Sequence, residues 1–86
     1  MSIAVDKDQL ASYFPYPCES FYTTGTREGV ILKFVNMYLK IYDDKEDIYL
    51  IEVYRYGWQN PISVDKVPSK RIREYATQLC RDCDCY

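Results

Sequence analysis

The chain has 86 residues, of which 11 are basic and 13 acidic, and it contains no histidine. The formal net charge of −2 argues against a protein whose main task is to neutralise phosphates along a nucleic-acid duplex, but it leaves room for a local basic patch. A chain of this length forms a single domain, 1–86, with a small core, and none of its apolar runs approaches the roughly 18 residues that span a membrane.

The first residues, MSIAVDKDQL, reach charged side chains before any apolar stretch long enough for a secretory signal. We therefore expect the protein in the cytoplasm, or in the cytoplasm of a host if a phage or another mobile element encodes it. Thiols are mostly reduced there, so the four cysteines favour metal ligands or free thiols over disulfides.

Asp6 is placed to begin a short amino-terminal helix, because its carboxylate can accept hydrogen bonds from the first backbone N–H groups. Gln9 stands three residues later, as in a capping box. Pro15 ends the helix, and Cys18 follows in a proline-rich loop. The apolar residues that share one side of this helix at helical spacing are Leu10, Tyr13 and Phe14.

Three strand-like runs follow, and they predict an antiparallel meander with strands at about 20–24, 30–42 and 48–56. Val, Ile and Tyr dominate the second and third runs, where apolar and polar residues alternate as they do in strands with one buried face. The side chains that we expect to point inward are Val35, Met37, Leu39, Ile41, Tyr49, Ile51 and Val53.

The charged linker DDKED predicts a turn at 44–45 between the second and third strands. That turn would place Leu39 near Ile51, and the same register would place Met37 near Val53. One apolar face would then continue across both strands.

The second run contains a conflict, because its apolar residues change parity near Lys33 and Phe34. They occupy even positions up to Phe34 and odd positions from Val35 onward. A bulge or a sharp bend at this point would bring both sets to one face.

Gly57 and Pro61 end the third strand, and 62–64 predicts a brief extended piece. A final helix is expected over 69–80, with Pro68 just before it. The complete prediction is an α+β domain with a short N-terminal helix, a three-stranded antiparallel meander and a C-terminal helix packed on the sheet. The stripe expected to contact the sheet is Ile72, Tyr75, Ala76 and Leu79.

The outward positions of the main hairpin gather tyrosines among charges of both signs. Tyrosine provides a large contact area at low entropic cost together with a hydroxyl group, so such a face suits protein binding. The alternative is that one of the helices covers this face. The residues predicted to contact a partner are Tyr38, Lys40, Tyr42, Glu52, Tyr54, Tyr56 and Trp58.

Basic residues gather around the start of the last helix, where they could bind a nucleic-acid backbone. The alternative is an ordinary solvated face, and the acidic net charge favours it. The residues of this second candidate site are Lys66, Lys70, Arg71 and Arg73.

The tail at 80–86 holds three cysteines, and a fourth precedes the strands. Four thiolates could hold one structural zinc ion, which would fasten the carboxyl end to the first loop. The thiols could instead be free or form a disulfide. The residues of this third candidate site are Cys18, Cys80, Cys83 and Cys85.

Catalysis has little support, because the chain has no histidine to serve as a general base and no Gly-rich phosphate loop. The leading prediction is a small non-enzymatic regulator or inhibitor that docks onto another protein through the Tyr-rich face. Nucleic-acid binding and a structural zinc site are the alternatives. A homodimer is a further alternative, and no membrane partner is expected.

Overall fold

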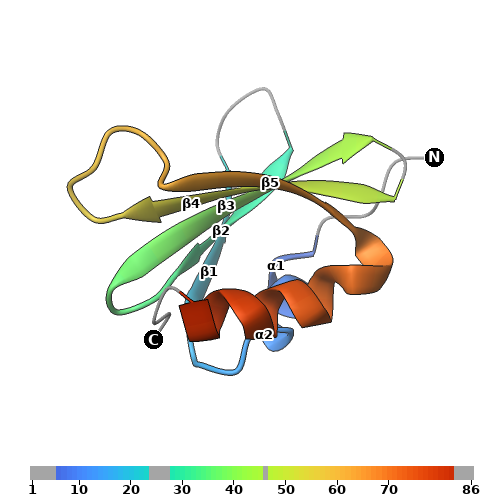
Figure 1. Cartoon of the computed structure of the whole chain (residues 1–86), viewed down its shortest axis with the longest axis horizontal. Coiled ribbons are helices and arrows are strands. Elements are labelled where there is room, and N and C mark those ends of the chain that lie inside the picture. Colours follow the sequence, from blue (N-terminus) through green and yellow to red (C-terminus); the bar gives the residue numbers. More distant parts are fainter. Residues whose placement is uncertain (1–5, 24–27, 46, 83–86) are drawn as a thin grey trace.

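The computed structural model describes residues 6–23, 28–45 and 47–82. In chain order these residues form a helix, five strands, a short 3₁₀ turn and a second helix (Figure 1). The elements are α1 (Lys7–Ser12), β1 (Glu19–Tyr22), β2 (Gly29–Lys33), β3 (Met37–Lys45), β4 (Ile48–Arg55), β5 (Ser63–Pro68), η1 (Ser69–Arg71) and α2 (Ile72–Asp82).

The strands form one antiparallel sheet in the order β1-β2-β3-β4-β5. The α+β class, the meander connectivity and the C-terminal helix are confirmed, but the predicted number of three strands is wrong. The run at 30–42 divides into two strands, and the piece at 62–64 belongs to a full fifth strand, Ser63–Pro68.

The change of apolar parity in the second run comes from a tight turn rather than a bulge. The backbone N–H of Phe34 donates to the carbonyl oxygen of Met37 at 2.8 Å, which closes the hairpin between β2 and β3. The register pairs even positions with odd ones, as in Leu32 with Leu39, so both sets face the same side. Val35, predicted to point inward, lies in the turn with 81% of its surface exposed.

The turn between β3 and β4 lies farther along the chain than predicted. Leu39 pairs with Val53 rather than Ile51, which is a shift of two residues. A register irregularity between Asp43 and Lys45 and a positive φ of 59° at Asp47 mark the actual turn. Because side chains alternate with a period of two, a shift of two leaves every side chain on its predicted face.

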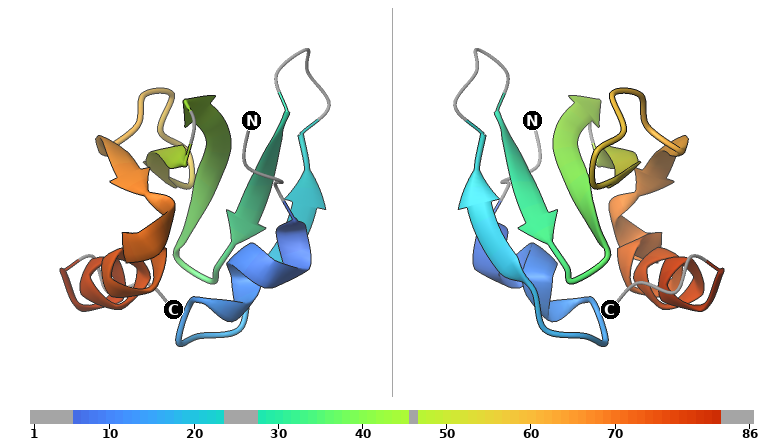
Figure 2. Two further views of the ribbon diagram at one scale, coloured as in Figure 1. Left: turned by 90° about the vertical axis from the view of Figure 1, so that its right-hand side faces the viewer. Right: turned by 90° about the vertical axis from the view of Figure 1, so that its left-hand side faces the viewer.

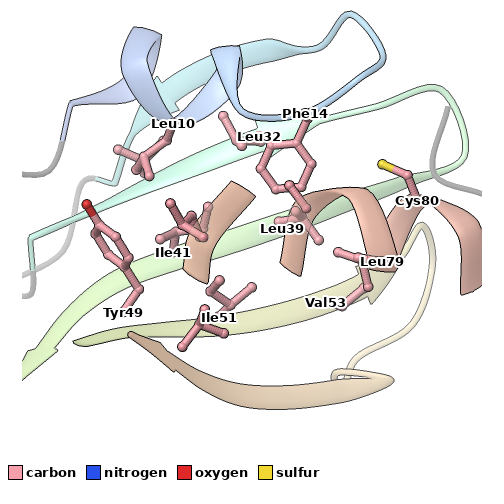
Figure 3. Close-up of a cluster of buried hydrophobic side chains, with 14 of the residues drawn as sticks. Leu10, Phe14, Leu32, Leu39, Ile41, Tyr49, Ile51, Val53, Leu79 and Cys80 are labelled. Atoms are coloured by element: carbon pink, nitrogen blue, oxygen red, sulfur yellow. The ribbon is translucent and has the colours of Figure 1, made fainter. Parts of the chain in front are cut away.

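Both helices pack on the same face of the sheet (Figures 1 and 2). One cluster of buried side chains joins Leu10 and Phe14 of the α1 region and Leu79 of α2 to the inward residues of the strands (Figure 3). Leu39 and Ile51, near the middle of the sheet, have no exposed surface. The predicted stripe of α2 is confirmed, since Ile72, Ala76 and Leu79 are buried and Tyr75 packs against the cluster.

The helix boundaries follow the predicted signals. Asp6 caps α1 and accepts hydrogen bonds from the backbone N–H groups of Asp8 at 2.9 Å and Gln9 at 3.1 Å. The predicted helix at 69–80 begins as the 3₁₀ turn η1 and continues as α2 to Asp82. In the part of the chain that the structure describes, no helix combines the length and the apolar character needed to cross a bilayer.

Candidate functional site

The face of the sheet opposite the helices, here called the open face, carries the alternate side chains of every strand. Neither described helix packs on it, because α1 and α2 share the other side. In residues 6–23, 28–45 and 47–82 its side chains are held by their neighbours within the sheet. The strand residues of the open face are Glu19, Phe21, Ile31, Lys33, Tyr38, Lys40, Tyr42, Leu50, Glu52, Tyr54, Val64 and Lys66.

A row of three phenol rings crosses this face. Tyr38 of β3 and Tyr54 of β4 are directly opposite in the register, and their rings stack with centroids 5.0 Å apart and planes 4° apart. Tyr56 continues the row, with its ring centroid 5.5 Å from that of Tyr38. The hydroxyl of Tyr56 donates to the carbonyl oxygen of Phe34 at 2.7 Å, so the row is anchored to the β2–β3 turn. Such packing holds the rings in one arrangement.

Tyr54 is the most buried ring of the row, with only 9% of its surface exposed. The ammonium group of Lys40 lies 5.0 Å from its ring centroid, and its hydroxyl donates to Glu52 Oε1 at 3.1 Å. Burial first, and then the hydrogen bond to Glu52, raise the pKa of Tyr54 to about 12. Tyr54 therefore positions its neighbours, while Tyr38 and Tyr56 present more of the accessible surface.

Tyr42 packs onto the backbone of the neighbouring strand. It pairs with Gly29 of β2, and a Cβ atom at Gly29 would lie 2.6 Å from Tyr42 Cδ1. Glycine is required there because the ring occupies the space that any side chain would fill. The ring thus covers the backbone at Gly29, which is buried, and is itself half-buried.

Trp58 lies outside the sheet, in the loop between β4 and β5. Its backbone N–H donates to the carbonyl oxygen of Arg55 at 3.1 Å, and Gly57 adopts a φ of +87° within this turn. The indole is 58% exposed. Trp58, predicted to contact a partner together with the residues of the main hairpin, therefore lies in the loop after β4 and not on a strand.

An open hollow of about 460 Å³ lies at the Tyr56 end of the open face. Its walls combine apolar groups with a few polar ones, the mixture typical of a pocket that accepts an anchoring side chain. The exposed Val35 forms part of its rim. The lining residues are Pro17, Cys18, Glu19, Lys33, Phe34, Val35 and Tyr56.

Sequence reasoning missed several apolar members of the open face. Phe21 of β1 pairs with Ile31 of β2, and the ammonium group of Lys33 lies 5.5 Å from the Phe21 ring centroid. Val64 of β5 is 51% exposed. These strands are too short for a clear alternation, so the parity of residues 19–22 and 63–68 becomes readable only once their pairing is known.

The four basic residues proposed for nucleic acid do not form one group of free cations. Lys66 pairs with Asp44 at 3.6 Å on the open-face side of β5. Arg73 lies over the Tyr13 ring with its Cζ 5.3 Å from the centroid, which directs it toward the α1 region. The other two members, Lys70 and Arg71, are exposed around the start of α2.

Two of the four cysteines proposed for zinc lie in the described part of the chain. Cys80 is buried in the core, and Cys18 is half-buried against it. Burial, followed by the proximity of Cys80, raises the pKa of the Cys18 thiol, which disfavours the thiolate that binds metals. Residues 6–23, 28–45 and 47–82 contain no group of three or more metal-binding side chains, and Cys83 and Cys85 lie outside the described residues.

No protein-family model, curated protein or solved structure was found to match this chain.

Proposed function

We propose that the protein binds another protein through the open face and acts as a small non-enzymatic regulator or inhibitor. The observation that carries this proposal is that both helices pack on one side of the sheet, which leaves the phenol row on the other. A sheet face with exposed Phe21, Val64 and Tyr56 is more apolar than solvation requires.

The charges of this face favour a protein over a nucleic acid. Basic Lys33 and Lys40 stand opposite acidic Glu19 and Glu52 in the strand register. The remaining cation, Lys66, is paired with Asp44. Because the acidic residues of this face offset its basic ones, its electrostatic attraction to the phosphates of a nucleic acid is weak. Tyrosines among charges of both signs are instead typical of protein interfaces.

The phenol row and the adjacent hollow would act together. Tyr38 and Tyr56 supply preorganised contact area, and the hollow next to Tyr56 would receive an apolar side chain of the partner. Occupying a partner's surface in this way requires no catalytic group. Regulation or inhibition follows when the occupied surface is one that the partner needs.

The test begins with affinity capture from the native host and identification of the captured protein by mass spectrometry. Titration of the purified partner should then show that Tyr38→Ala and Tyr56→Ala each weaken binding by about tenfold or more, the effect of losing a hot-spot side chain. The matched control is Gln9→Ala, an exposed position on α1. Wild-type affinity in both tyrosine variants, with folding verified by circular dichroism, would refute the assignment of this face.

A further inference from the structure

Among the described residues, β1 (cyan) and β5 form the two edges of the sheet, and they differ in their protection against an added strand (Figure 2). β5 carries Asp65, Lys66 and Pro68, and charged side chains and proline are residues that protect an exposed edge. β1 has the sequence ESFY, with its one charge at the first position and no proline. Its Phe21 and Tyr22 are 44% and 53% exposed. β1 is therefore the less protected edge.

The backbone of β1 directs alternate residues toward β2 and away from the sheet. The N–H of Thr23 donates to the carbonyl oxygen of Gly29 at 3.0 Å, in register with the ladder between β1 and β2. In an antiparallel ladder every second residue directs both its N–H and its C=O group toward the neighbouring strand. Residues 19, 21 and 23 therefore bond to β2, while Ser20 and Tyr22 direct their backbone groups outward along the edge.

We propose that a second copy of this chain pairs with this edge, so that the two β1 strands run antiparallel about a two-fold axis beside Phe21. In this register Ser20 of each copy pairs with Tyr22 of the other, which joins the outward N–H and C=O groups of both residues. Phe21 lies opposite Phe21 of the second copy in a non-hydrogen-bonded pair, where Cα atoms are about 4.5 Å apart and side chains are closest.

The side chains of β1 complement one another in this register. Phe21 lies on the open face, where the ammonium group of Lys33 is 5.5 Å from its ring centroid, and the two Phe21 rings would meet on that face. Ser20 and Tyr22 belong to the helix side of the sheet. Each exposed Tyr22 ring would therefore pass over the short Ser20 side chain of the other copy, so a large residue meets a small one twice.

The charges of β1 do not oppose the pairing. Glu19, its charged residue, would lie opposite Thr23 of the second copy, and Lys33 stands beside Glu19 in the register of its own sheet. The two Glu19 side chains would be four residues apart along the strands, or about 14 Å. That separation exceeds the distance of about 8 Å over which salt screens exposed charges at physiological ionic strength. A register shifted by two residues would instead place Glu19 against Phe21.

The length of β1 sets the strength of this dimer. A strand of four residues is a poor template for pairing, and the contact resembles that of weak, transient assemblies more than that of permanent ones. The dimer should therefore form at high protein concentration and dissociate on dilution. Because odd residues pair with odd residues, both open faces would lie on the same side of the joined sheet. The dimer itself does not depend on the function proposed above.

The first experiment is sedimentation of the full chain between about 1 μM and about 1 mM, which spans the dissociation constants of weak assemblies. A reversible equilibrium between monomer and dimer is expected. At the upper concentration the amides of Ser20 and Tyr22 should gain protection from hydrogen exchange. A monomer throughout this range, or a dimer whose added protection lies elsewhere, would overturn the proposal.

A charge exchange at the two-fold axis tests the register. Phe21→Lys and Phe21→Glu each place like charges directly opposite one another, so each should weaken the dimer at least about tenfold. An equal mixture of the two variants should restore dimerisation, because a lysine then faces a glutamate. Wild-type dimerisation of either variant alone, or no recovery in the mixture, would contradict pairing at Phe21.

Two substitutions at one position isolate the main-chain bonds. Ser20→Pro removes an outward N–H group that makes no bond to β2, so the fold should survive while dimerisation falls at least about tenfold. Ser20→Ala keeps the N–H group and a short side chain, and it should dimerise as the wild type does. Circular dichroism verifies folding of both variants. Equal dimerisation of the two would overturn strand pairing.

Other modes of self-association give distinct results. Tyr38→Ala alters the open face away from the β1 edge, so it should leave the dimer unchanged. Loss of the dimer in this variant would place the contact between two open faces. Species that grow beyond a dimer with concentration would indicate head-to-tail pairing of β1 with β5. Either result would overturn the two-fold pairing of β1.

Discussion

The two faces of the sheet are built from the same strands, yet they differ in what covers them. On the helix-covered face, aliphatic side chains such as Leu39 and Ile51 have no exposed surface. On the open face the neighbouring positions hold Tyr38, Lys40 and Glu52, which are half-buried and each contact Tyr54. Because successive side chains alternate between faces, substitutions one residue apart separate effects on folding from effects on the proposed docking face.

The largest effect is expected from the covered face. Ile51→Ala removes a fully buried side chain at the centre of the sheet and leaves a cavity, so the free energy of unfolding should fall by about 2–5 kcal/mol. Urea denaturation followed by circular dichroism measures this change. A loss below about 1 kcal/mol would contradict the difference between the faces, since values that small are typical of surface positions.

The next effect tests the close approach of Tyr42 to the backbone. Gly29→Ala would place a Cβ atom 2.6 Å from Tyr42 Cδ1 and 2.9 Å from the carbonyl oxygen of Ile41. Relieving these contacts should cost about 1–3 kcal/mol of stability, as overpacking does. Adding Tyr42→Ala to this variant should recover only part of the loss, because the Ile41 contact remains. Unchanged stability of Gly29→Ala would show that Tyr42 does not lie over Gly29.

A smaller effect is expected within the phenol row. Tyr38→Ala removes the ring that stacks on Tyr54, and the free energy of unfolding should fall by about 0.5–1.5 kcal/mol beyond the loss of buried area. Tyr16→Ala is the control, because this exposed loop residue lies outside the row and should change stability by no more than about 0.5 kcal/mol. Equal effects of the two substitutions in urea denaturation would argue against an ordered row.

The last effect is absent at neutral pH and appears only in alkaline solution. The folded protein holds the pKa of Tyr54 at about 12, above its ordinary value of about 10, so the unfolded chain loses this proton first. Stability from this group is therefore complete below pH 10 and declines as pH rises from 10 to 12. Tyr54→Phe should show a shallower decline over this window when urea midpoints are compared. An identical slope in both proteins would show that Tyr54 titrates normally.

Much of the local architecture followed from side-chain pattern. Asp6 and the spacing of Leu10 and Phe14 specified a capped helix, because capping and helical periodicity depend on neighbours in the chain. Alternation likewise assigned Leu39 and Ile51 to one face, and a register shift of two residues did not change that assignment. Periodicity therefore determined which side chains are inward even where it misplaced their partners.

Only the tertiary structure decided where the chain turns, how the strands pair and which face the helices cover. The pairing of the fifth strand and the burial of Tyr54 depend on contacts between residues distant in sequence. The turn at 34–36 is closed by the bond from Phe34 to Met37, and the pairing of β2 with β3 on either side of it holds it in place. Local patterns carry no information about such contacts, since either face of a sheet with apolar residues on both sides could pack against a helix. The aliphatic face became the core because it buries more apolar surface without sequestering charged groups.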